Sequence, residues 1–230
     1  MARSSPRKTT RMKSVLAILA RTYAEAKCSL TYKNPFELLC ATILSAQCTD
    51  ERVNMVTPAL FKRYPDAHAL AKAKQADVEA IIKSTGFYKN KATSLIACAT
   101  ALVHDHSGEV PRDLDALVKL RGVGRKTANV VLGNAYGIPG LVVDTHVGRL
   151  TRRMGFTTKT DAVDVEHEMM ELVPKAQWTL FSHWLINHGR ARCDARRPDC
   201  VGCELKSLCP KVGVDAKFLP KPGAVDHDAL

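Results

Sequence analysis

The chain has 230 residues, with 34 lysines and arginines against 23 aspartates and glutamates, so its net charge is +11. The length fits one large domain or two small ones, and a hydrophobic content of 46% excludes a globally disordered chain. No apolar run approaches the roughly 18 residues of a membrane span, and the short run at 14–20 ends at Arg21, so neither a membrane protein nor secretion is expected. The charge favours polyanionic partners, nucleic acid first and a membrane surface second.

The two ends of the chain differ in composition from the rest. Residues 1–13 carry five basic residues and no acid, which predicts a disordered basic arm; their arginine and serine content also fits an organelle transit peptide, although the segment is short for one. Residues 212–230 contain two prolines and little apolar pattern, which predicts a flexible tail.

Between the ends, almost every segment has the pattern of a helix. Apolar residues recur at helical spacing from Leu95 to Val103, and glycines are expected to end three helices, 77–85 at Gly86, 145–154 at Gly155 and 178–188 at Gly189. Another helix begins at Asp161 and ends before Pro174, whereas the only strand-like run is the short one at 141–143. The pattern predicts an all-α protein of about ten helices.

One segment, RGVGRKTANVVLGNAY, joins two of these helices through a tight turn. Gly122 and Gly124 flank Val123, and the second helix opens near Arg125. The free amides and the positive dipole end of that helix can bind a phosphate that the glycines let approach. The segment 114–136 therefore predicts a helix–hairpin–helix that contacts the DNA backbone.

The residues around this hairpin are strongly basic. The stretch 118–153 holds seven lysines and arginines, including Arg149, and a single acid. An ordinary solvated face is the alternative, but next to a phosphate-binding turn the charge favours DNA, and Arg149 is a candidate contact.

Lys126 lies in the first turn of the second hairpin helix, where the helix dipole and neighbouring Arg125 both oppose a positive charge. A lysine whose neutral form is favoured is a nucleophile that can form a Schiff base with a sugar carbon. The alternative is a phosphate clamp, and either role places Lys126 at the DNA.

Asp144 is the single acid of the basic stretch. It precedes an expected helix, which is the position of an ordinary N-cap. A carboxylate near Lys126 could also stabilise a developing oxocarbenium charge and manage protons as a base departs, and the two roles are compatible. His146 and His188 lie on apolar-flanked helices and are assigned structural roles.

The eight cysteines form two populations. Four of them, Cys28, Cys40, Cys48 and Cys98, lie in apolar surroundings and are expected to fill a core. The other four are Cys193, Cys200, Cys203 and Cys209, spaced C-x6-C-x2-C-x5-C in a polar segment. This spacing predicts a four-thiolate metal site. Two disulfides would need an exported chain, and zinc or an iron–sulfur cluster both remain open because neither has this spacing in its common form.

Several motifs together resemble the endonuclease III family of base-excision DNA glycosylases. LRGVGRKTANVVL, VDTH with its aspartate eighteen residues after Lys126, and the four-cysteine spacing match that family in kind, order and spacing. NPFELLCATILSAQCTD and TGFYKNKA also fit, so the resemblance covers about 14–210.

The resemblance implies a fold of two helical domains with DNA between them. A six-helix barrel would span about 28–138, and a discontinuous domain of 14–27 and 139–211 would carry a 4Fe-4S cluster on Cys193, Cys200, Cys203 and Cys209. Lys126 would be the nucleophile and Asp144 the essential aspartate.

Two further positions follow from the resemblance. Gln47 would fill the space left by the flipped nucleotide, and Phe87 would wedge against the opposite strand. Leucine is more usual than phenylalanine at that second position, so the preference for the opposite base is open.

The resemblance implies a monomeric enzyme that removes oxidised pyrimidines from double-stranded DNA and nicks abasic sites by β-elimination. It would be cytoplasmic and nucleoid-associated in a bacterium, or nuclear or mitochondrial in a eukaryote. A mismatch glycosylase for adenine or thymine is the nearest alternative, although such relatives generally lack the lysine. A non-catalytic DNA-binding module with structural zinc is the alternative from another class.

Overall fold

The computed structural model describes residues 6–220. Within these residues the chain forms eleven α-helices and no strand, which confirms the all-α prediction. None of the helices in this range is both long and apolar enough to cross a membrane. The chain divides into two compact units: unit 2 is Cys28–Gly140, and unit 1 combines the segment that ends at Lys27 with the segment that begins at Leu141. The domain bounds that the resemblance implies fall close to this division.

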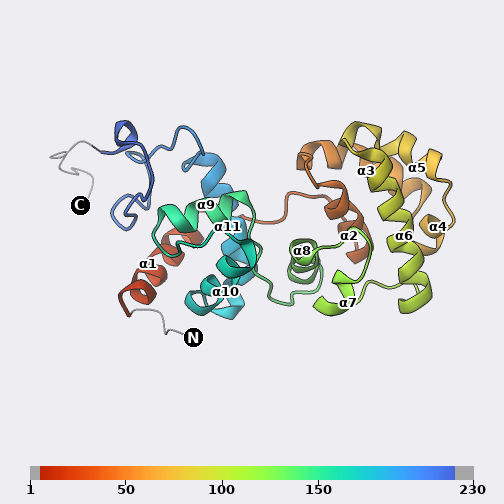
Figure 1. Ribbon diagram of the computed structural model, residues 1–230, viewed down its shortest axis with the longest axis horizontal. Coiled ribbons are helices and arrows are strands. Elements are labelled where there is room, and N and C mark those ends of the chain that lie inside the picture. Colours follow the sequence, from red (N-terminus) through yellow and green to blue (C-terminus); the bar gives the residue numbers. More distant parts are fainter. Residues whose placement is uncertain (1–5, 221–230) are drawn as a thin grey trace. The chain divides into compact units, whose positions relative to one another are not determined.

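Unit 2 is a bundle of seven α-helices built around a buried central helix (Figure 1). Its elements are α2 (Pro35–Leu44), α3 (Asp50–Arg63), α4 (Ala67–Ala71), α5 (Gln75–Ile82), the 3-10 turn η1 (Lys83–Thr85), α6 (Tyr88–His106), α7 (Leu114–Val118) and α8 (Arg125–Ala135). Every residue of α2 from Phe36 to Leu44 is buried, because its sequence is apolar on all sides apart from Glu37 and Thr42. α2 packs against α3, α6 and α8, so it forms the centre of the bundle.

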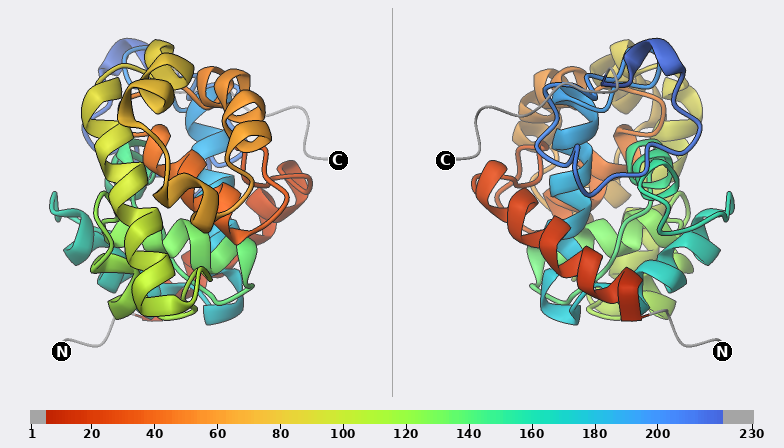
Figure 2. Two further views of the ribbon diagram at one scale, coloured as in Figure 1. Left: turned by 90° about the vertical axis from the view of Figure 1, so that its right-hand side faces the viewer. Right: turned by 90° about the vertical axis from the view of Figure 1, so that its left-hand side faces the viewer.

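Unit 1 packs the first helix of the chain against two later ones (Figure 1). Its elements are α1 (Pro6–Thr22), α9 (Thr145–Arg153), α10 (Ala162–Leu172), the 3-10 turn η2 (Lys175–Gln177), α11 (Trp178–Ala191) and the 3-10 turn η3 (Ala216–Phe218). Phe156 and Phe181 are buried at its core. Figure 2 shows the segment after α11, in darker blue, as an irregular loop.

The prediction of a disordered basic arm is wrong for residues 6–13, because α1 begins at Pro6. Met12, Val15, Leu16 and Leu19 form one apolar face with helical spacing, and all four are buried. Residues 1–5 of the predicted arm lie outside the described residues. The apolar face of α1 therefore anchors the basic segment to unit 1.

Two of the three predicted glycine stops are found, since η1 ends before Gly86 and α9 ends before Gly155. The third prediction is wrong: α11 continues past Gly189 to Ala191. A Cβ on Gly189 would lie 2.5 Å from Nδ1 of His146, so this glycine allows α11 to approach α9 closely instead of ending the helix.

The predicted flexible tail is also partly structured. The amide of Val212 donates to the carbonyl of Arg153 at 2.9 Å, and η3 follows at 216–218. Residues 221–230 of the tail lie outside the described residues. The strand-like run at 141–143 is an extended segment whose Val142 amide donates to the Ser182 hydroxyl at 2.9 Å.

Candidate functional site

The hairpin turn between α7 and α8 is fixed by its glycine and by its valine. Gly122 has a φ of +82°, and a Cβ there would lie 2.9 Å from the Cβ of Ser94, so both its conformation and its packing require glycine. Val123 is only 5% exposed, and its amide donates to the carbonyl of Leu120 at 3.1 Å. Val123 was predicted to meet DNA, but the structure uses its side chain and its amide to anchor the turn.

The N-terminus of α8 has no side-chain cap. Gly124 occupies the cap position with extended backbone, and no atom lies within 4 Å of where its Cβ would be. The first turn contains Arg125 and an exposed Lys126 but no acid. An uncapped helix N-terminus with open space beside it offers its dipole and backbone amides to an anion such as phosphate. This arrangement is what a contact with the DNA backbone requires.

Asp144 caps α9, as its position in the sequence predicted. Its Oδ1 accepts a hydrogen bond from the amide of Val147 at 2.8 Å, and the residue is half-buried. The cap fixes the direction of the carboxylate, while Oδ2 remains available as an acceptor. Lys126 belongs to unit 2, whereas Asp144 belongs to unit 1.

Gln47 and Phe87 lie on one groove of unit 2, although they are far apart in the sequence. The groove has a volume of about 250 Å³ and is lined by Ile43, Ala46, Gln47, Phe87, Asn90, Lys91, Ser94 and Gly122. Both Gln47 and Phe87 have left-handed backbone, with φ of 53° and 46°. The Phe87 side chain is 66% exposed, which is unusual for a residue of its size and leaves it free to insert between bases. The structure thus brings Gln47, Phe87 and Gly122 together in one groove, and all three were predicted to contact DNA.

The four clustered cysteines line a single pocket of unit 1, together with residues of α9 and α11. The loop that carries them is held by Arg192, which bonds to Asp199 at 3.0 Å and to Glu204 at 3.1 Å. Across residues 6–220, no group of three or more histidine, cysteine or acidic side chains is arranged to hold a single metal ion. The remaining cysteines behave as core residues: Cys40 and Cys98 are buried, and Cys28 and Cys48 pack at the edge of the same core.

Hydrogen-bond donors surround the sulfur atoms of this pocket. Arg153 approaches Cys193 Sγ at 3.3 Å, and the amides of Leu205 and Lys211 approach the Sγ atoms of Cys203 and Cys209, each at 3.4 Å. Such donors stabilise thiolates and cluster-bound sulfur. Burial raises the pKa of the Cys203 thiol to about 12, so binding of a metal centre there must displace its proton.

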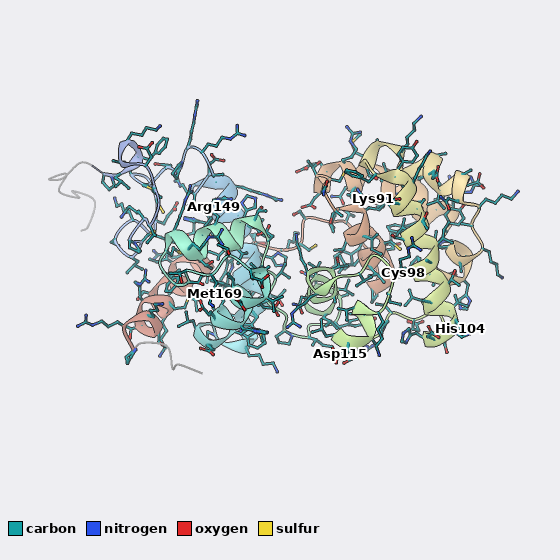
Figure 3. All side chains as sticks on the ribbon, viewed as in Figure 1. Lys91, Cys98, His104, Asp115, Arg149 and Met169 are labelled. Carbon is teal, nitrogen blue, oxygen red and sulfur yellow. The ribbon has the colours of Figure 1, made fainter. Side chains whose placement is uncertain are left out.

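Arg149 makes its hydrogen bonds within the chain. Its guanidinium donates to the carbonyl of Cys193 at 2.9 Å and to that of Gly189 at 3.3 Å, and it lies 3.1 Å from Nδ1 of His146. Figure 3 labels this side chain on α9. It was predicted to contact DNA, but these contacts instead join α9 to the cysteine loop.

Two supporting arginines were not predicted. Arg153 donates to the carbonyls of Asp194 and Ala195, and Arg11 of α1 donates to Leu208 and stacks 4.2 Å from the Phe156 ring. The spacing of Arg153, four residues after Arg149 on the same face of α9, was the available signal. His188 is structural as expected: it is 3% exposed and contacts the Tyr23 hydroxyl at 3.0 Å and Cys203 Sγ at 3.4 Å.

Comparisons with known proteins agree with this geometry. A family profile described as HhH-GPD superfamily base excision DNA repair protein matches residues 40–175. The endonuclease III of Synechocystis sp. is 51% identical over 211 residues, which cover 91% of this chain and 96% of that protein. A non-covalent endonuclease III–DNA complex and a trapped endonuclease III–DNA covalent intermediate each align with a TM-score of 0.84 at 42% identity, over 88% of this chain and over 95% and 96% of theirs. The chain therefore belongs to the HhH-GPD superfamily of base excision DNA repair proteins and, within it, to the endonuclease III family.

Proposed function

We propose that the protein is a DNA N-glycosylase that removes oxidised pyrimidines from double-stranded DNA and cuts the resulting abasic site through a Schiff base on Lys126. The observation that carries this proposal is the uncapped start of α8, where an exposed lysine lies beside a phosphate-binding turn. A related endonuclease III has been solved as a trapped covalent intermediate with DNA, which supports a covalent route for this chain.

In the proposed reaction the neutral amine of Lys126 bonds to C1′ of the damaged nucleotide. The N-glycosidic bond breaks with its electron pair, and the departing base takes up a proton. The sugar ring then opens to an imine, a proton is lost from C2′, and departure of the 3′ phosphate cuts the strand by β-elimination. Water hydrolyses the imine and regenerates the lysine. The carboxylate of Asp144 stabilises the positive charge that develops on the sugar and handles the protons.

The other residues bind and open the duplex. Gly122, Gly124 and the first turn of α8 hold a backbone phosphate, with Arg125 adding positive charge. Gln47 fills the space left by the extruded nucleotide, and Phe87 separates the bases of the opposite strand. Extrusion costs a few kcal/mol of stacking and pairing, which favours damaged bases because they stack and pair less well.

Cys193, Cys200, Cys203 and Cys209 would hold a 4Fe-4S cluster. Their convergence on one pocket and the donors around their sulfur atoms fit four thiolate ligands. When bound, the cluster would cross-link the loop after α11 at four points, in a segment with few apolar residues of its own. Purified protein is expected to be yellow-brown and to contain iron; a colourless zinc protein would contradict the cluster.

Borohydride trapping over a panel of duplexes tests the enzymatic proposal. Duplexes with an oxidised pyrimidine or an abasic site should give a covalent adduct, while undamaged DNA should give none. Adducts confined to adenine or thymine mismatches would favour the mismatch glycosylase instead. DNA binding without any adduct would favour a non-catalytic module. Because the relatives compared are bacterial, we further propose that the enzyme acts on nucleoid DNA in the cytoplasm.

A further inference from the structure

Lys91 is a buried lysine that the proposed reaction does not use. It lies on α6, as Figure 3 shows, and is only 6% exposed. Its Nζ donates to the carbonyls of Leu44 and Thr85, each at 2.8 Å. Leu44 is the last residue of α2 and Thr85 is the last residue of η1. One side chain therefore joins the ends of two separate segments.

Burying this amine costs free energy of desolvation, which its two hydrogen bonds must offset. Burial lowers the pKa of Lys91, and the charge on nearby Cys48 only partly opposes this effect, so the ammonium form carries a desolvation cost at this position. An apolar side chain of similar length would fill the same volume without that cost. The bonds to two carbonyls at the ends of helical segments, where acceptors lack partners, are thus the specific contribution of a lysine.

Both segments that Lys91 joins lead directly to the residues proposed to open the duplex. Gln47 follows Leu44 by three residues, and Phe87 follows Thr85 by two. Both have left-handed backbone, which is unfavourable for a residue other than glycine and persists only where the surroundings hold it. Lys91 also lines the groove that these two side chains share.

The same helix contacts the hairpin one turn further on. Ser94 packs against Gly122 so closely that a Cβ on the glycine would lie 2.9 Å from the serine Cβ. α6 therefore contacts the Gln47 segment, the Phe87 segment and the phosphate-binding turn, all within unit 2. A rigid common support is what two residues that insert into DNA together require.

We propose that Lys91 is a positioning residue that holds Gln47 and Phe87 as one rigid wedge, so that both side chains enter the duplex together. This inference rests on the proposed function, since it assigns a role in extruding the nucleotide. A merely structural lysine that ends two helical segments would lower the stability of unit 2 but would leave the insertion of the wedge unchanged once the protein is saturated with DNA.

The test compares Lys91→Met, which keeps the length and removes the donors, with Lys62→Met, which removes an exposed ammonium from α3 of the same unit. The first probe is a duplex that places 2-aminopurine opposite a tetrahydrofuran abasic analogue, where insertion of the wedge unstacks the fluorescent base. The second is borohydride trapping on a single-stranded abasic oligonucleotide, which needs the nucleophile but no opening of a duplex.

We expect Lys91→Met to lose most of the fluorescence increase at saturating protein and to bind the lesion duplex about 10-fold more weakly, a change of about 1.4 kcal/mol. Its trapping on single-stranded DNA should match that of the unaltered protein, and Lys62→Met should be unchanged in both assays. In addition, Lys91→Met should have little further effect on the fluorescence when Phe87 is already alanine, because the two act through one structure.

A full fluorescence increase with folded Lys91→Met would overturn the proposal. If that variant does not fold, the same two assays are carried out on Lys91→Gln, which retains a donor. Loss of the fold in both variants would assign Lys91 to stability alone and would also overturn it. Failure of the proposed function is distinguishable, because the unaltered protein would then give no adduct on either form of abasic DNA.

Discussion

The two helices that carry the proposed catalytic residues begin in opposite ways. α8 starts at Gly124, which has no side chain and makes no cap, whereas α9 starts at Asp144, whose carboxylate caps the Val147 amide. The Val147 amide of α9 is bonded to a side chain of the same chain, whereas no side chain caps the first turn of α8, which leaves it open to the proposed phosphate. The start of α8 suits the proposed binding of an anion, and the start of α9 holds a carboxylate in place.

The distribution of charge repeats this difference. α9 has Arg152 and Arg153 in its last turn, where the helix dipole favours cations. α8 has Arg125 and Lys126 in its first turn, where the dipole disfavours them. An unfavourable local arrangement at one helix and a favourable one at the next is what the proposed binding of phosphate at α8 would produce, at some cost in stability.

Removing the amine from α8 should have the largest effect. Lys126→Gln is expected to abolish both the borohydride adduct and the strand nick, because it removes the amine that is proposed to form the imine. Its thermal stability should be equal or slightly higher, since a cation leaves the positive end of a helix dipole. Lys72→Gln, an exposed lysine in the same unit, is the matched control and should trap normally. Strand cleavage that persists in Lys126→Gln would count against the assignment.

At α9, the two roles of Asp144 can be separated. Asparagine caps helices about as well as aspartate, so Asp144→Asn should keep its stability while base excision falls by on the order of 100-fold or more. Asp144→Ala should lose the same activity and, in addition, about 1 kcal/mol of unfolding free energy. Asp161→Ala, which removes the N-cap of α10, should lose a similar stability but no activity. Single-turnover rates measure the activity, and urea unfolding measures the stability. Full activity of Asp144→Asn would show that Asp144 acts only as a helix cap.

Giving α8 a side-chain cap like that of α9 should weaken its proposed binding of phosphate. Gly124→Asp places a carboxylate at an open cap position, where it can accept the first-turn amides and repel phosphate. We expect DNA affinity to fall by about 10-fold, which corresponds to about 1.4 kcal/mol, while thermal stability holds or rises. Gly124→Ala fits the same space without an acceptor and should bind DNA nearly normally. Equal affinities of the two variants would show that the amides of α8 do not meet a phosphate.

Arg149 gives the smallest expected effect on DNA binding. Because its donors bond to the cysteine loop, Arg149→Met should leave the salt dependence of DNA affinity unchanged, whereas loss of a phosphate contact would lower the slope of log affinity against log salt by about 1. Iron retention during dialysis against a chelator should decrease, since the loop is held less firmly. A lower salt slope with normal iron retention would instead support the contact between Arg149 and DNA that the sequence predicts.

Local patterns predicted much of the molecule. The all-α class, the N-cap at Asp144 and the glycine ends of two helices depend on residues a few positions apart, which a sequence shows directly. The apolar face of α1 is local as well, but the charges around Met12 concealed it. Gly189 illustrates a different limit, because a glycine that ends a helix and a glycine that admits a neighbouring helix look the same in one sequence.

The supports of the site were not predictable in this way. Lys91 reaches the Leu44 carbonyl across 47 residues of sequence, and Arg149 reaches Cys193 across 44. Charge alone indicates that a side chain can bind an anion. It does not show whether the donors of that side chain are already hydrogen-bonded to carbonyls of the same chain. The DNA contacts that the basic stretch predicts therefore stay a prediction, and assigning a role to each individual cation needed the fold.

Locating the covalent bond tests the central claim most directly. The adduct formed with abasic-site duplex under borohydride can be digested with nuclease and protease, and the peptide that carries the nucleotide remnant identified by mass spectrometry. The account predicts a single modified position, Lys126, at the start of α8. A remnant on another lysine or on the N-terminal amine, with Lys126 unmodified, would contradict it.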